Sequence, residues 1–244
     1  MCYPELRPDG VLAQLDILAE TVRPRLSGRA PRERLGRLIQ YLFFELRFRG
    51  NSADYHDPRN SYLNDVLARR TGIPITLALV FIEVARRLGF ESYGVGLPGH
   101  FAAAAVTGDE VVYVDAFNAG TLLDAGTMAG LVQRATERHV LFDPAWLQPV
   151  TAHAFLARMC GNLQNVYVMR QDWNRAALAT ERLYLFTHAS AALRDLGYLA
   201  FQAGQLRRAA EAFESYLAAA PDAEDSAAVV ENVASIYQRL ARLN

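Results

Sequence analysis

The pattern of apolar positions predicts two helices at the start of the chain. Apolar residues recur at helical spacing over residues 11–26 and again over residues 31–48. The segment RPRLSGRAP between them contains a glycine and two prolines, which interrupt regular structure. We therefore expect two N-terminal helices joined by a short irregular connection.

Two further helices are predicted before residue 90. Residues 50–57 are polar and favour a loop, and the helical pattern after Pro58 is expected to end near Gly72, since glycine commonly follows a helix C-terminus. Pro74 suits the first turn of the next helix, whose apolar pattern continues to Gly89. Because this last segment is apolar nearly all round, it is predicted to be the central helix.

The pattern changes after Gly89 to one typical of strands. ESYGVGLPGHFAAAAV and VVYVDAF are separated by the turn-forming TGDE. The four alanines favour helix by propensity, but the flanking turn residues and the β-branched second run favour a hairpin.

From about residue 151 the chain is predicted to be entirely helical, with an internal repeat. Small and large residues fit one tetratricopeptide-type helix pair of roughly 34 residues, namely Leu196, Gly197, Ala200, Gly204, Ala209, Phe213, Tyr216 and Pro221. A weaker copy lies upstream in NLQNVYVMRQDWNRAALATERLYLF, and residues 225–243 resemble a capping helix. We therefore predict two domains, residues 1–150 and 151–244.

Composition narrows the functional classes. All 25 basic residues are arginine, and the net charge is −1. Because the net charge is close to zero, no long-range field attracts nucleic acid or anionic lipid. Neither a secretory signal nor a membrane-length apolar stretch is present, and Cys2 and Cys160 form no disulfide or metal-binding pattern. We expect a cytoplasmic protein without membrane or nucleic-acid partner, metal or cofactor; the sequence gives no oligomeric state.

His100 and Asp115 are the residues that carry candidate chemistry. A turn at Gly108-Asp109 places them diagonally on one sheet face, and a turn at Thr107-Gly108 places them directly opposite each other. A three-residue loop would put them on opposite faces. The pair could act as a base and its orienting carboxylate, or it could be a structural polar cluster.

Most of the chain resembles a known family. The run HDPRNSYLNDVLARRTGIPITLALVFIEVARRLGF, followed by YGVGLPGHF and VDAFNAG, is similar to the SirB family, from roughly residue 10 to the C-terminus. This resemblance implies an α+β, papain- or transglutaminase-like core, with a central helix against a small antiparallel sheet, followed by all-α tetratricopeptide-like repeats. Members of the family are generally of unsettled biochemical function.

In the wider transglutaminase superfamily a cysteine at the start of the central helix works with a histidine and an aspartate. The resemblance implies these last two roles for His100 and Asp115. Pro74 occupies the cysteine position, and proline offers no nucleophile. Thr76 is the nearest hydroxyl, although a first-turn cap is an easier role for it; Cys160 is a more distant alternative.

Five residues of the family-like stretch are predicted to line a binding cleft: Asn60, Tyr62, Arg70, Pro74 and Phe101. Structural alternatives exist, because Asn60 or Ser61 could cap the next helix and Arg70 could face the helix dipole.

These observations favour a protein that has lost the nucleophile of its superfamily and binds a protein or peptide. The alternative is an amide hydrolase or acyltransferase that uses His100 and Asp115 with Thr76 or another nucleophile. A third possibility is a scaffold whose cleft has no function.

Overall fold

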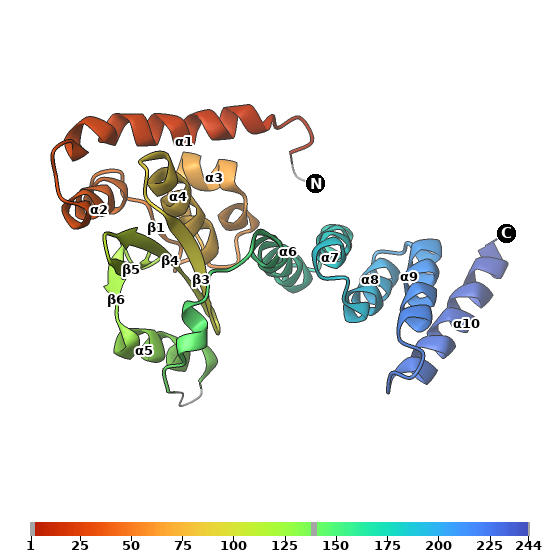
Figure 1. The fold of residues 1–244 in the computed structure, drawn as a ribbon. Coiled ribbons are helices and arrows are strands. Elements are labelled where there is room, and N and C mark those ends of the chain that lie inside the picture. The colour runs from red at the N-terminus through yellow and green to blue at the C-terminus, as the bar shows by residue number, and fades with distance from the viewer. Residues whose placement is uncertain (1–2, 138–140, 244) are drawn as a thin grey trace. The chain divides into compact units, whose positions relative to one another are not determined.

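We analysed a computed structural model of the chain, which describes residues 3–137 and 141–243. The chain forms two compact units: the first is Tyr3–Val150 and the second contains Thr151–Asn244. Figure 1 shows helices and a small sheet in the first unit and a row of helices in the second.

The first unit begins with the two expected helices. Helix α1 spans Pro8–Val22 and is followed by a short 3-10 turn, η1 (Arg23–Leu26). Helix α2 spans Pro31–Ile39 and continues as a π-helical segment, η2 (Gln40–Glu45). Both α-helices have proline in the first turn, where its missing N–H is not needed.

The next segment is more divided than its sequence predicts. It contains strand β1 (Arg49–Gly50), the 3-10 turn η3 (Pro58–Ser61), helix α3 (Leu63–Arg69) and strand β2 (Thr71–Gly72). Strands β1 and β2 pair in parallel. Strands of two residues are too short to show an alternating pattern, so the sequence did not reveal them.

Two expectations about the ends of α3 are wrong. The helix ends at Arg69, and Arg70 takes the left-handed conformation (φ 55°) expected of a glycine, whereas Gly72 belongs to β2. At the other end Tyr62 occupies the N-cap position without a side-chain cap, so neither Asn60 nor Ser61 caps this helix.

Helix α4 (Pro74–Arg87) is the central helix that the sequence predicts. It begins at the proline, and Gly89 beyond its end has φ 85°. Ten of its side chains are buried, and it packs against strands of the sheet on one side and α1 on the other.

The sheet has four antiparallel strands in sequence order: β3 (Ser92–Leu97), β4 (His100–Thr107), β5 (Glu110–Asp115) and β6 (Thr121–Leu123). The β4–β5 hairpin is confirmed, and the alanine run is strand. The first apolar run is two strands rather than one, because the chain turns back at Pro98-Gly99.

The two faces of the sheet are covered by different helices. Val95, Ala102 and Ala104 share one face with Tyr113 and Leu123. Helix α5 (Ala125–Thr136) covers that face through Met128 and Val132, together with the 3-10 turn η4 (Pro144–Leu147). Alternation directs Phe101, Ala103 and Ala105 to the opposite face, toward α4. Figure 1 shows the sheet between α4 and α5.

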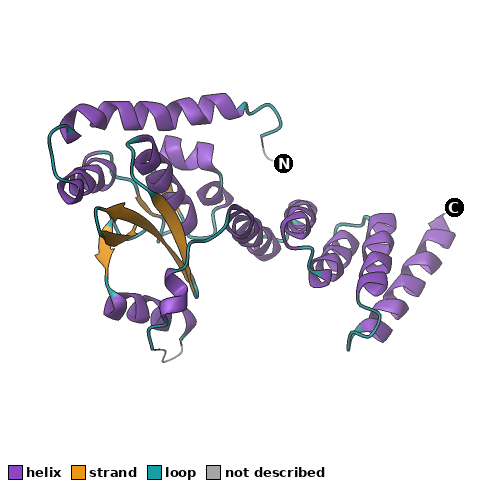
Figure 2. Ribbon diagram, viewed as in Figure 1, coloured by secondary structure: helices purple, strands orange, loops and turns teal. Residues whose placement is uncertain are grey.

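The second unit is helical, as expected. It consists of α6 (Ala152–Met169), α7 (Trp173–Thr187), α8 (Ser190–Gln202), α9 (Leu206–Ala219) and α10 (Ser226–Leu243). Figure 2 shows no strand in its described residues. Phe213 lies so close to Gly197 that a side chain there would overlap its ring, which explains the small residue at this repeat position.

Candidate functional site

His100 and Asp115 meet at one end of the sheet. Thr107 pairs with Glu110, so the hairpin turn is Gly108-Asp109, and His100 lies diagonally from Asp115 on the same face. Nε2 of His100 lies 3.1 Å from Oδ1 of Asp115, and the two side chains are 10% and 1% exposed. The imidazole and the carboxylate are therefore in direct contact.

The Asp115 carboxylate is held by donors from the turn that follows β5. Oδ1 accepts hydrogen bonds from the backbone N–H groups of Phe117 (3.1 Å) and Asn118 (3.2 Å), and Oδ2 accepts one from the Asn118 amide (2.7 Å). Burial raises the pKa of Asp115, but His100 and Asn118 together outweigh it, so this pKa lies below its ordinary value. Asp115 is therefore a buried carboxylate that stays ionised.

Two aromatic rings extend the site beyond the pair. The Phe117 ring stands edge-on to the His100 imidazole at a centroid distance of 6.3 Å, and the Tyr55 ring lies 6.0 Å from the Phe117 ring. The backbone N–H of Gly50 donates to Phe117 O, and a side chain at Gly50 would overlap the Phe117 ring. Tyr55 remains 40% exposed. These rings form a partly open apolar wall beside His100.

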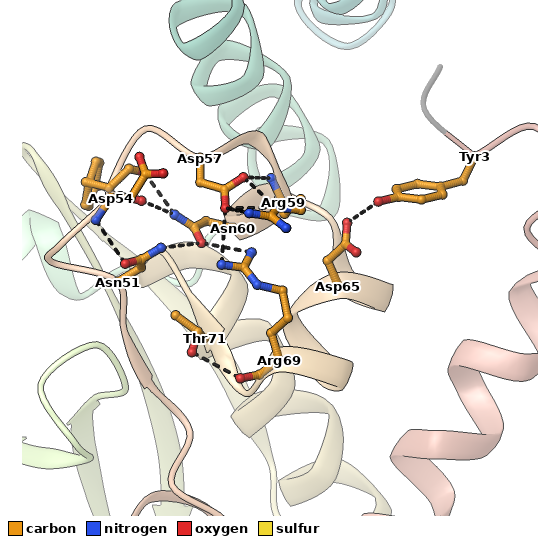
Figure 3. A network of polar contacts seen from close by, with 10 residues as sticks. Tyr3, Asn51, Asp54, Asp57, Arg59, Asn60, Asp65, Arg69 and Thr71 are labelled. Atoms are coloured by element: carbon orange, nitrogen blue, oxygen red, sulfur yellow. Dashed lines mark hydrogen bonds and ion pairs between the residues drawn. The ribbon is translucent and has the colours of Figure 1, made fainter.

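Asn60 fixes the loop that carries Tyr55, and Figure 3 shows its contacts with Asn51 and Asp54. Its completely buried amide donates to the carbonyl oxygens of Asp54 (2.8 Å) and Tyr55 (3.1 Å), and its Oδ1 accepts from Asn51 (3.1 Å). Because the side chain is buried, Asn60 holds this loop in place and does not line a surface.

A buried carboxylate anchors the same segment from the other side (Figure 3). Asp57 is 4% exposed and pairs with Arg59 (2.8 Å) and Arg69 (3.2 Å). Burial raises the pKa of Asp57, but the hydrogen bonds from Arg59 and the charge of Arg69 lower it by a larger amount. The pKa of Asp57 therefore lies below its usual value.

The hydroxyl of Thr76 has a structural role. The side chain is wholly buried, and Oγ1 donates to Asn60 O at 2.7 Å, with Ile73 O at 3.1 Å. Oγ1 also accepts from the Ile73 N–H at 3.1 Å, which caps the first turn of α4. Pro74 is buried as the first residue of this helix. The start of α4 thus has neither a thiol nor a hydroxyl with a spare proton.

The other predicted binding residues lie in different surroundings. Arg70 is exposed, and its guanidinium donates to Leu46 O at 3.1 Å. The Tyr62 ring packs edge-on against Tyr3 at 5.5 Å. Phe101 is 1% exposed on the face toward α4, so it can support the site only from within the core.

Sequence reasoning missed Tyr55, Phe117 and Asn118. Asn118 could have been found, because Asp-x-x-Asn after a strand is a common turn in which the aspartate accepts backbone hydrogen bonds. Tyr55 could not have been found, because tertiary contacts such as those of Asn60 with its loop and of its ring with Phe117 bring it to the sheet.

A cavity of about 510 Å³ opens on the α5 side of this site. Asp115 and Asn118 border it, together with β6 and one side of α5. Within residues 3–137 and 141–243, no group of three or more His, Cys, Asp or Glu side chains is placed to hold a metal; Cys2 and His139 lie outside this range. No helix in the described part of the chain is long and apolar enough to cross a membrane.

Residues 9–161 match the family model of the transglutaminase-like superfamily. The chain belongs to this superfamily. Residues 163–234 match the tetratricopeptide repeat. The two matches together account for the α+β core and the helical region that follows it, and these two kinds of domain suggest a protein-binding module.

Named relatives cover the same regions. The chain is 41% identical over 182 residues to a UPF0162 protein of Xylella fastidiosa, a match that covers 73% of this chain and 65% of that protein. A UPF0162 protein of Vibrio cholerae is 23% identical over 75% of the chain and 68% of its own length. Human F-box only protein 21 is 35% identical over 50% of the chain, but only 20% of that protein is matched. No solved structure matches the chain significantly.

Proposed function

We propose that the transglutaminase-like domain binds a peptide segment of a partner protein without cleaving or transferring it. In this proposal His100 contacts the peptide backbone, Asp115 holds the imidazole in place, and Tyr55 and Phe117 pack against the side chains of the peptide. Residues 1–150 form this domain, and residues 151–244 form a tetratricopeptide-like module, capped by α10, that holds another part of the partner. We also propose that the protein is cytoplasmic and that it is a member of the SirB family, which its sequence resembles.

The observation that supports the proposal is that His100 and Asp115 are in contact while no free nucleophilic side chain lies at the start of α4. Residues 3–150 contain no cysteine, and the Thr76 hydroxyl is buried and fully engaged. The His100–Asp115 contact persists beside them at 3.1 Å. A histidine held by a carboxylate can act as a base, but it can also donate a hydrogen bond to a peptide carbonyl.

The surroundings of the pair also favour peptide recognition. A half-exposed tyrosine beside a phenylalanine offers apolar area with a polar tip, a combination common where proteins bind peptides. Asn60 and Asp57 hold this wall in place before any ligand arrives, which reduces the entropy lost on binding.

The test begins with a phage-displayed library of random peptides selected on the full-length chain. Synthetic copies of the selected peptides are then titrated by fluorescence anisotropy against the wild-type chain and against His100→Ala, Asp115→Asn and Tyr55→Ala. We expect each variant to weaken binding by about tenfold or more, with an unchanged circular dichroism spectrum. His153→Ala, an exposed histidine of α6, is the matched control and should leave binding unchanged.

Catalysis has a separate readout. If glutamine-containing peptides release ammonia with the wild-type chain but not with His100→Ala, the domain is an enzyme and the proposal is wrong. If Asp115→Asn and His100→Ala change stability and no peptide binds, the domain is a scaffold.

A further inference from the structure

The cavity beside Asp115 is bordered by Arg134, an exposed arginine in the last turn of α5 that has no ion-pair partner among the described residues. Its walls are the end of β5, strand β6 and the side of α5, with Thr121 and Leu123 on one side and Gly126, Gly130 and Arg134 on the other. The two glycines are four residues apart on α5 and face the same side of the helix. Because they lack side chains, they leave the space that the cavity occupies.

The Asp115 carboxylate is not available to a ligand in this cavity. Its two oxygens already accept hydrogen bonds from Phe117 and Asn118 and face the imidazole of His100. The hydroxyl protons of Thr121 and Thr127 are likewise donated within the chain, to Asn118 O and to Asp124. The polar groups of β5, β6 and the first turn of α5 are therefore largely satisfied.

Arg134 differs from all of them. Its guanidinium lies back along α5, so that Nη1 would be 3.4 Å from a Cβ added at Gly130. Among the residues that the structure describes, none forms a hydrogen bond or ion pair with Arg134. A guanidinium offers five donors in a planar fork that matches a carboxylate, so this wall of the cavity is suited to an acidic group.

The remaining lining agrees with an amino-acid side chain as the occupant. Leu123 is half-buried and Leu131 lies one turn before Arg134, so apolar area adjoins the guanidinium. The aliphatic part of a glutamate or aspartate can pack on these leucines while its carboxylate reaches Arg134.

We infer that this cavity is the specificity pocket of the proposed peptide site and takes an acidic side chain of the bound peptide through Arg134. This inference rests on the proposed function, since the peptide main chain must run past His100 and Asp115. It assigns Arg134, Gly126 and Gly130 to partner selection, which is a role separate from the His100–Asp115 pair.

The experiment varies the charge of Arg134 and the charge of the peptide residue that is proposed to contact it. Peptides selected on the wild-type chain should share an aspartate or glutamate at one position. Replacing that residue by its amide should weaken binding by about tenfold to the wild-type chain and by much less to Arg134→Gln. Selection on Arg134→Glu should favour lysine or arginine at the same position. Arg37→Gln, an exposed arginine of α2, is the matched control and should leave the acidic preference intact.

A second variant tests the space rather than the charge. Gly130→Leu should fill the cavity and abolish the acidic preference. It should not weaken α5, because leucine favours the helix more than glycine does. If peptides bind in a His100-dependent manner but show no acidic preference, or keep it in Arg134→Gln, the inference is wrong and the proposed function stands. If the wild-type chain selects no peptide, both fail.

Discussion

At the scale of single residues, the site depends on polar groups that are buried and fully used. Thr76 links the first turn of α4 to Asn60, and Asn60 in turn holds the loop of Tyr55. Asp115 and Asp57 are buried carboxylates whose charge is stabilised by neighbouring donors. In the proposed function these residues act on the peptide mainly by fixing the side chains that touch it.

Thr76→Val tests whether the hydroxyl is structural. It removes the acceptor of the Ile73 N–H and the donor to Asn60 O, so we expect a loss of about 1–3 kcal/mol in the free energy of unfolding. Urea titrations in a Trp173→Phe background, followed by Trp146 fluorescence, report on the first unit alone. Thr21→Val, an exposed threonine of α1, should change stability by less than about 0.5 kcal/mol. Equal effects of the two variants would contradict the structural role.

Stability should fall at acid pH in a defined direction. Asp57 and Asp115 have pKa values below the ordinary 3.8 in the folded chain, so near and below that pH the unfolded chain binds more protons. Their contribution is therefore complete above about pH 5 and is lost as the pH falls through their folded pKa values.

Unfolding free energies measured from about pH 3 to pH 7 in the Trp173→Phe background test this. Asp57→Asn should lower stability at neutral pH, because Arg59 and Arg69 lose their ion pairs with this carboxylate. It should also flatten the acid limb of the curve. An acid limb as steep as that of the parent chain would contradict the pKa assignment of Asp57.

At the scale of elements, the sequence predicted the elements with a clear period and missed those defined by tertiary contacts. Helix α4 and the β4–β5 hairpin follow from apolar periodicity and from the turn residues Gly108-Asp109. The hairpin register alone brings His100 and Asp115 to one face. Strands β1, β2 and β6 have two or three residues, and Arg70 takes a glycine-like conformation while its guanidinium binds Leu46 O. Neither these short strands nor the conformation of Arg70 has a signal in the local sequence.

The turn between β5 and β6 should be sensitive to the size of one residue. Gly120 has φ 72°, and a side chain there would overlap the Phe43 ring and contact Ile39. Gly89 has φ 85° and open space around it. We expect Gly89→Ala to cost about 1–2 kcal/mol from the backbone alone, and Gly120→Ala to cost a further 1–3 kcal/mol or so from overpacking. Unfolding free energies of both variants measure the difference.

Gly120→Ala should also weaken peptide binding, because the turn it distorts holds the Asp115 carboxylate. Gly89→Ala should not. Equal stability losses in the two variants, with unchanged binding, would show that this turn does not position the site.

At the scale of the whole molecule, a transglutaminase-like core and a tetratricopeptide region occur in one chain. In the proposed function, His100 and Asp115 take the places of the superfamily's histidine and aspartate, and the buried Pro74 and Thr76 begin the central helix. Sequence comparison finds both regions. It could not find the cavity beside α5, because Gly126, Gly130 and Arg134 meet β6 only in the folded unit.

The most direct test of the central claim is a crystal structure of the full-length chain with the tightest peptide from the selection. We predict an intact, non-covalently bound peptide that passes His100 and Tyr55, with an acidic side chain against Arg134. A covalent bond between the peptide and any side chain, or a peptide bound only to helices α6–α10, would contradict the account.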